Sequence, residues 1–197
     1  MLLRLPLAVP HLVWWFGWLL LVALAWIPHW LFVLAAGRPL GRVARFSAAW
    51  IRYTTHVFAF LFLVGGPFPG FTGTQGSYPV DPSIDPFGRQ KRWLTLGRPP
   101  LPWIGPPLAW PAMLVWSALA GLLLFVAVLG WFVALVQGRM PTGLQRAGAY
   151  CLGYGAQVSS YVFLLTDRYP HASPQAVFMR REAAAQPLDS IEPGAFV

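Results

Sequence analysis

Long uncharged stretches dominate the chain. Residues 5–37 and 99–138 contain no Asp, Glu, Lys or Arg, and each stretch exceeds the roughly 20 residues that a helix needs to cross a bilayer. Residues 47–64 and 147–165 are shorter and less apolar, but they still approach that length. The pattern predicts an all-α integral membrane protein with four transmembrane helices.

The sequence contains an internal repeat. When it is shifted by 101 residues, matching positions fall in one register without a gap, among them Trp15 with Trp116, Trp30 with Trp131, Gly37-Arg38 with Gly138-Arg139, and Tyr53 with Tyr154. Apolar bias alone aligns leucines, but it does not align Trp, Tyr and Gly-Arg together. We therefore interpret residues 1–70 as a first hairpin repeat and 108–172 as a second. Residues 71–107 are a Pro/Gly-rich connection that includes the start of the second repeat, and 173–197 are a polar C-terminal tail.

Each repeat contains an even number of predicted spans, so both copies should enter the membrane in the same orientation. Such parallel repeats are related by a pseudo-two-fold axis along the membrane normal. Both termini then lie on one side. Five arginines occupy the two hairpin turns and eight basic residues the opposite side, which favours cytoplasmic termini in a multi-pass membrane protein.

Composition supports a membrane location and argues against several other classes. Hydrophobic residues make up 57% of the chain and charged residues 10%, with a formal charge of +8. Because no soluble domain is available to read a nucleic acid, arginines facing anionic lipid headgroups explain the charge, and no nucleic-acid partner is expected. The lone Cys151 gives no disulfide framework. The sequence offers no nucleophile with a base and no metal-ligand spacing, so we expect no catalytic residues, no metal and no cofactor.

One helical stripe is the main candidate for a binding site. Arg42, Arg45, Arg52 and His56 are spaced by three, seven and four residues, which places them on one side of the predicted second helix. Ionisable groups inside a span are functional candidates because an unpaired charge there is costly. The stripe suits a lipid phosphate, a quinone carbonyl or an acidic partner. The alternative is that Arg52 snorkels to the headgroups and His56 is a packed, neutral residue.

A second pattern concerns helix packing. Ala147, Cys151, Gly155 and Ser159 recur every four residues in the predicted fourth helix. Small residues at this spacing let helix backbones approach closely. They predict a packing face between the two hairpins or against a partner.

The end of each hairpin is the third feature. "VFLLTDRYPHASP" in the second repeat corresponds to "VFAFLFLVGGPFPGF" in the first, where Gly66 and Pro67 stand in place of Asp167 and Arg168. A chemical role would therefore belong to one copy only. We expect a cap at the end of the helix, with Asp167 and Arg168 engaging each other, the backbone, headgroups or a partner.

Several motifs resemble those of a bacterial membrane family known as domain of unknown function 4389. They are Tyr78-Pro79-Val80, Arg92, Leu94-Thr95, Gly138-Arg139, Pro141, Gly143-Leu144 and residues 163–170, with Pro10-His11 in the first half. The resemblance implies two tandem copies, of which the first is degenerate and truncated at its start. It implies a multi-pass domain of the bacterial inner (cytoplasmic) membrane and no particular activity.

Three functions are consistent with these observations. The main hypothesis is a non-catalytic accessory or structural subunit of a larger membrane complex, in contact with lipids and other membrane-protein subunits. The second is a lipid or small-molecule binding or transport module that uses the cleft between the repeats. The third is a cofactor- or pigment-supporting subunit of a photosynthetic or respiratory complex, with His11 and His29 as the histidines beside several tryptophans.

Overall fold

The computed structural model describes residues 4–84, 88–100 and 105–171, and within these ranges it contains helices and no strand. The helices are α1 (Arg4–Ala36), α2 (Gly41–Leu61), the short α3 (Arg92–Leu96), the 3₁₀ turn η1 (Pro107–Ala109), α4 (Trp110–Gln137) and α5 (Thr142–Val162). Two segments, Pro6–Ala36 and Pro107–Gln137, are long and apolar enough to cross a membrane. The predicted polar tail lies outside the described residues.

The two hairpins share their local structure. α1 and α4 both end at a glycine in the left-handed conformation, Gly37 at φ 66° and Gly138 at φ 73°, as is common one residue beyond a helix. The bounds of α2 and α5 correspond at the same shift of 101 residues. Beyond them, Leu63 and Leu164, at φ 61° and 59°, are the two non-glycine residues with positive φ in the described ranges. The repeat seen in the sequence is therefore also a conformational repeat.

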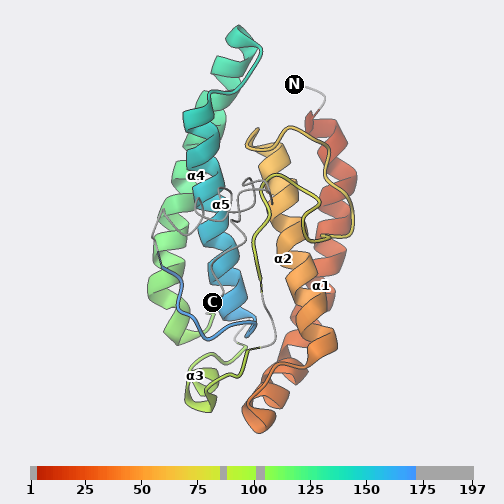
Figure 1. The fold of residues 1–197 in the computed structure, drawn as a ribbon, viewed down its shortest axis with the longest axis vertical. Helices are drawn as coiled ribbons and strands as arrows, with labels where there is room; N and C mark the ends of the chain where they lie inside the picture. Colours follow the sequence, from red (N-terminus) through yellow and green to blue (C-terminus); the bar gives the residue numbers. More distant parts are fainter. Residues whose placement is uncertain (1–3, 85–87, 101–104, 172–197) are drawn as a thin grey trace, which may run out of the picture.

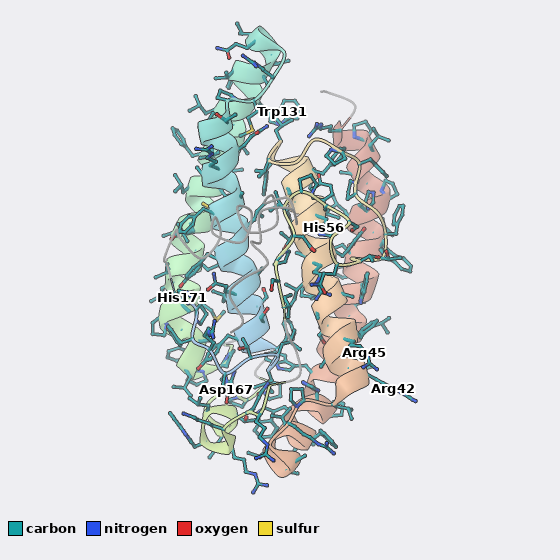
Figure 2. All side chains as sticks on the ribbon, in the orientation of Figure 1. Arg42, Arg45, His56, Trp131, Asp167 and His171 are labelled. Atoms are coloured by element: carbon teal, nitrogen blue, oxygen red, sulfur yellow. The ribbon has the colours of Figure 1, made fainter. Side chains whose placement is uncertain are left out.

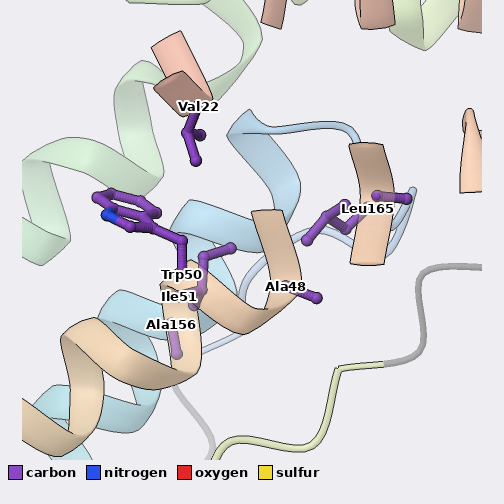
Figure 3. Packing of buried hydrophobic residues seen from close by; sticks show 7 residues of the cluster. Val22, Ala48, Trp50, Ile51, Ala156 and Leu165 are labelled. Carbon is purple, nitrogen blue, oxygen red and sulfur yellow. The ribbon is translucent and has the colours of Figure 1, made fainter. Parts of the chain in front are cut away.

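α2 and α5 form the centre of the molecule, with α1 packed on α2 and α4 on α5 (Figure 1). A hydrophobic cluster joins Ala48 and Ile51 of α2 to Ala156 and Leu165 of the other hairpin (Figure 3). Small side chains there bring the helix backbones close together. The outer helices leave many large apolar side chains exposed, such as Leu24 in α1 and Phe125 in α4.

The hairpins run in opposite directions, and the predicted parallel arrangement is wrong for this structure. Ala48, near the start of α2, packs with Leu165, which follows the end of α5. Leu63, after the end of α2, packs with Met140 in the turn between α4 and α5. α2 and α5 are therefore antiparallel, and the pseudo-two-fold axis is perpendicular to the helices.

The path of the connection between the hairpins explains this difference. The prediction of parallel hairpins, made from the even number of spans in each repeat, assumed that the connection stays at one end of the helices. Instead it travels the length of α2, and the backbone N–H of Gln90 donates to the carbonyl of Gly37 in the turn between α1 and α2 (3.0 Å). As a result, the start of α1 and the end of α5 lie at opposite ends of the four-helix body (Figure 1). The chain termini themselves lie outside the described residues, so the side on which they lie stays a prediction.

Candidate functional site

The connection packs closely on the middle of α2. A Cβ atom added to Gly73 would lie 2.0 Å from the carbonyl oxygen of Ala49 and 3.0 Å from the backbone nitrogen of Tyr53. Farther along, the connection reaches His56 through Asp81 and Arg52 through Ile84. Two of the four residues in the predicted basic stripe are therefore held by the chain itself.

His56 is at the centre of this contact (Figure 2). Its side chain is buried, and Nε2 lies 2.9 Å from Oδ1 of Asp81. The imidazole stacks on the ring of Tyr78, with centroids 5.0 Å apart. Tyr78 donates from its hydroxyl to the carbonyl of Pro67 (2.9 Å), and burial, partly opposed by the charge of Arg4, raises the pKa of Tyr78 to about 12. The arrangement is a polar clasp between α2 and the connection.

The rest of the predicted stripe is arranged differently. Nη2 of Arg52 donates to the carbonyl of Ile84 (3.2 Å), whereas Arg42 and Arg45 are exposed near the start of α2 (Figure 2). The structure does not bring the four residues together at one ligand-sized site. Helical spacing placed them correctly on one helix, but it carried no information about the segment that covers part of that helix.

We predict that Asp81→Ala will loosen the connection. The substitution leaves the buried Nε2 of His56 and the backbone N–H of Gly76 without their carboxylate acceptor. An unmet buried donor costs about 1–3 kcal/mol, so amide hydrogen exchange should accelerate across residues 76–84. The exposed Ser83 provides the matched control Ser83→Ala, and equal exchange in the two variants would contradict the clasp.

A second polar centre lies at the end of α5. Arg98 is fully buried, and its Nη1 donates to the carbonyls of Tyr161 and Thr166, both at 2.9 Å. Nη2 pairs with Oδ1 of Asp167, and the guanidinium lies over the ring of Tyr161 at 4.3 Å. The guanidinium thus satisfies carbonyls at the end of α5 and neutralises one carboxylate.

This geometry corrects the expected pairing between Asp167 and Arg168. Asp167 pairs with Arg98 and also accepts from the backbone N–H of Lys91. Arg168 is exposed, and its backbone N–H donates to Oγ1 of Thr166 (3.1 Å). Asp167 binds residues of the connection because that segment passes the end of α5, whereas its neighbour points to the surface.

Like Arg98, Arg4 binds backbone carbonyls at the end of a hairpin, and it does so at the opposite end of the molecule. Its Nη1 donates to the carbonyls of Phe60 (3.0 Å) and Gly65 (3.1 Å), the counterparts of the two carbonyls that Arg98 binds. The guanidinium lies 4.8 Å from the centroid of the Phe60 ring. Each hairpin end is therefore clamped by an arginine of its own repeat, Arg4 at the first residue of α1 and Arg98 before α4.

Sequence reasoning missed both clamps. Arg4 and Arg98 are 94 positions apart, whereas the repeat has a period of 101, so an ungapped alignment pairs Arg4 with Gly105. A gap of seven residues before the Pro-bounded helix start would have revealed the correspondence.

The predicted packing residues fall into two groups. Cys151 and Ala147 lie in clusters with residues from the end of α2, between the hairpins. Gly155 instead faces α4 of its own hairpin, where an added Cβ would lie 2.5 Å from the ring of Trp116. The carbonyl of Ser159 accepts from the backbone N–H after α5. The four-residue stripe thus contributes to packing both between and within hairpins.

The candidate cofactor residues lie within α1. Nδ1 of His11 is 2.8 Å from the hydroxyl of Tyr53, and the imidazole stacks on Phe71. His29 is buried, and its ring nitrogens have no hydrogen-bond partner among the described residues. The same part of the chain holds no group of three His, Cys, Asp or Glu side chains with metal-binding geometry. Two shallow hollows lie at the α1–α2 turn and beside Trp110, away from the interface between the hairpins.

Comparison with known proteins gives one match. Residues 108–173 match the model of a family described as a domain of unknown function, DUF4389. The match covers about a third of the chain, including α4, α5 and Asp167. The first hairpin lies outside it, so a second tandem copy of this domain stays a prediction. No curated protein and no solved structure matched the chain.

Proposed function

We propose that the protein is a non-catalytic integral membrane protein that acts as an accessory or structural subunit of a larger membrane complex. In this proposal all four long helices cross the bilayer. α1 and α4 present their exposed apolar side chains to lipid, and the amphipathic α2 and α5 form the interior. The two hairpins then insert in opposite orientations.

The position of the connection carries the proposal. Gly73 lies against the middle of α2, and its neighbours Thr72, Thr74 and Gln75 are exposed. α2 has 21 residues and is about 32 Å long, close to the roughly 30 Å hydrocarbon thickness. If α2 spans the bilayer, these polar groups lie near its centre, where irregular backbone requires cover by protein or water.

This requirement favours a partner subunit. Part of this segment is satisfied within the chain, because Thr72 and Thr74 pair through their hydroxyls and the carbonyl of Thr74 accepts from Ser77. A lipid-facing surface would still leave the exposed side-chain amide of Gln75 and the remaining exposed backbone groups without hydrogen-bond partners, at a cost of several kcal/mol per group. A partner that supplies polar groups at this depth removes the cost. The apolar faces of α1 and α4 need no such partner because lipid is a suitable solvent for them.

A site-directed photo-crosslinking experiment in native membranes tests this proposal. A photoreactive group attached to Gln75→Cys should capture another protein, whereas the same group at Phe125→Cys, on the exposed face of α4 (65% exposed), should capture lipid. The native Cys151 is buried and should not compete for the reagent. Two observations together would support the proposal. They are protein adducts at position 75 and a complex with another protein that survives mild detergent in native mass spectrometry.

Two results would contradict it. A lone monomer in mild detergent, with no protein adduct at position 75, would remove the need for a partner. Rapid labelling of the cysteine at position 75 by a membrane-impermeant maleimide would show that water covers this face instead.

A further inference from the structure

The two arginine clamps differ in whether the guanidinium has an anionic partner. Arg98 and Arg4 bind carbonyls at corresponding positions and lie over corresponding aromatic rings. Nη2 of Arg98 then pairs with the carboxylate of Asp167. At the counterpart of Asp167, the chain has Gly66, which offers Nη2 of Arg4 its backbone carbonyl at 3.3 Å. Arg4 therefore has carbonyl partners where Arg98 has an anion.

The donors of Arg4 are also incompletely used. A guanidinium carries five N–H donors, and Nε of Arg98 donates to the carbonyl of Leu94 (3.2 Å). Arg4 has three hydrogen bonds to backbone carbonyls and, among the described residues, no ion pair. Arg98 is fully buried, whereas Arg4 is partly exposed. The charge of Arg4 is thus accessible from outside, and Nε with Nη2 forms a fork that suits bidentate recognition of an anion.

We propose that Arg4 binds a phosphate group in the position that the Asp167 carboxylate occupies in the other hairpin. The surroundings leave room for it, because a Cβ added at Gly66 would meet no atom within 4 Å. Planar guanidinium groups match phosphate geometry. The phosphate belongs either to an anionic lipid or to a small solute.

The location suits a lipid headgroup. Arg4 is followed by the uncharged stretch of residues 5–37, so a spanning α1 would place it at the boundary between hydrocarbon and headgroups. The lipid source rests on the proposed membrane location, whereas binding of free phosphate does not. Neither source depends on the partner subunit, so failure here and failure of crosslinking at position 75 are separate results.

Two substitutions at this site test the proposal. Gly66→Asp should supply the missing carboxylate and exclude the external anion, while adding a side chain where there is space. Arg4→Gln should remove the charge that holds the anion. Each should weaken binding of phosphatidylglycerol about tenfold, as measured by native mass spectrometry of purified protein titrated with the lipid. Titration with inorganic phosphate, read by thermal stability, distinguishes the solute from the lipid.

Matched controls separate a specific site from general charge effects. Gly70 is exposed and has equally open surroundings, so Gly70→Asp adds the same charge nearby, and Arg146→Gln removes an exposed arginine of α5. Both controls should bind the lipid as the unmodified chain does. The proposal would be overturned if Gly66→Asp and Gly70→Asp lost lipid affinity equally, or if folded Gly66→Asp bound the lipid as the unmodified chain does. Circular dichroism verifies the helical content of every variant.

Discussion

Arg98→Leu should lower the free energy of unfolding by about 3–5 kcal/mol, the range for removing one partner of a buried ion pair. The Arg98 side chain is fully buried, and that of Asp167 is 18% exposed. The substitution leaves the carboxylate without its cation and the carbonyls of Tyr161 and Thr166 without their shared donor. Denaturant unfolding in mixed micelles, followed by circular dichroism, measures the change.

A neighbouring arginine provides the control for this prediction. Arg168 is exposed, so Arg168→Leu should change the unfolding free energy by no more than about 0.5 kcal/mol. The double variant Arg98→Leu with Asp167→Leu should lose less than the sum of the two single changes, because the partners are in contact. Similar changes in the unfolding free energy for Arg98→Leu and Arg168→Leu would show that the Arg98 clamp contributes little to stability.

Much of the secondary structure could be predicted from the sequence because its signals are local. Uncharged stretches predicted α1 and α4, and the glycines at 37 and 138 marked their ends. Tryptophan, tyrosine and Gly-Arg pairs in one register predicted the repeat, which reappears in the shared conformation of Leu63 and Leu164. Each of these features depends on a few consecutive residues or on a fixed period.

The relative direction of the hairpins could not be predicted in this way. It depends on the path of the connection between the hairpins, and in the described residues that path is set by contacts between distant residues, such as Gly73 with the backbone of α2. The spacing of Arg52 and His56 identified unusual residues inside a helix. Their partners, the carbonyl of Ile84 and the carboxylate of Asp81, belong to a segment with no periodic pattern.

The arginine clamps were hidden for a related reason. A guanidinium can reach its carbonyls from a long, flexible side chain, so its position along the chain need not keep the period of the helices. Arg4 belongs to α1 itself, whereas Arg98 comes just after α3 and is separated from α4 by a longer segment. The same contacts are therefore reached from different positions in the repeat, and a fixed shift cannot detect them.

Gly73→Ala should destabilise the protein by about 2–5 kcal/mol. An alanine at φ +58° has an unfavourable left-handed backbone, which costs roughly 1–2 kcal/mol. Its Cβ would also lie 2.0 Å from the carbonyl oxygen of Ala49, so either α2 or the connection must move, which adds about 1–3 kcal/mol. Denaturant unfolding and hydrogen exchange across residues 67–84 measure the two effects.

The difference between Gly73→Ala and Gly76→Ala isolates the steric part of that cost. Gly76 has a similar φ of +76°, but a Cβ added there would meet nothing within 4 Å, so only the backbone cost of about 1–2 kcal/mol should appear. The comparison also tests the direction of the hairpins. A connection confined to one end of the helices, as parallel hairpins require, would keep Gly73 away from the middle of α2, and the two variants would then lose the same stability.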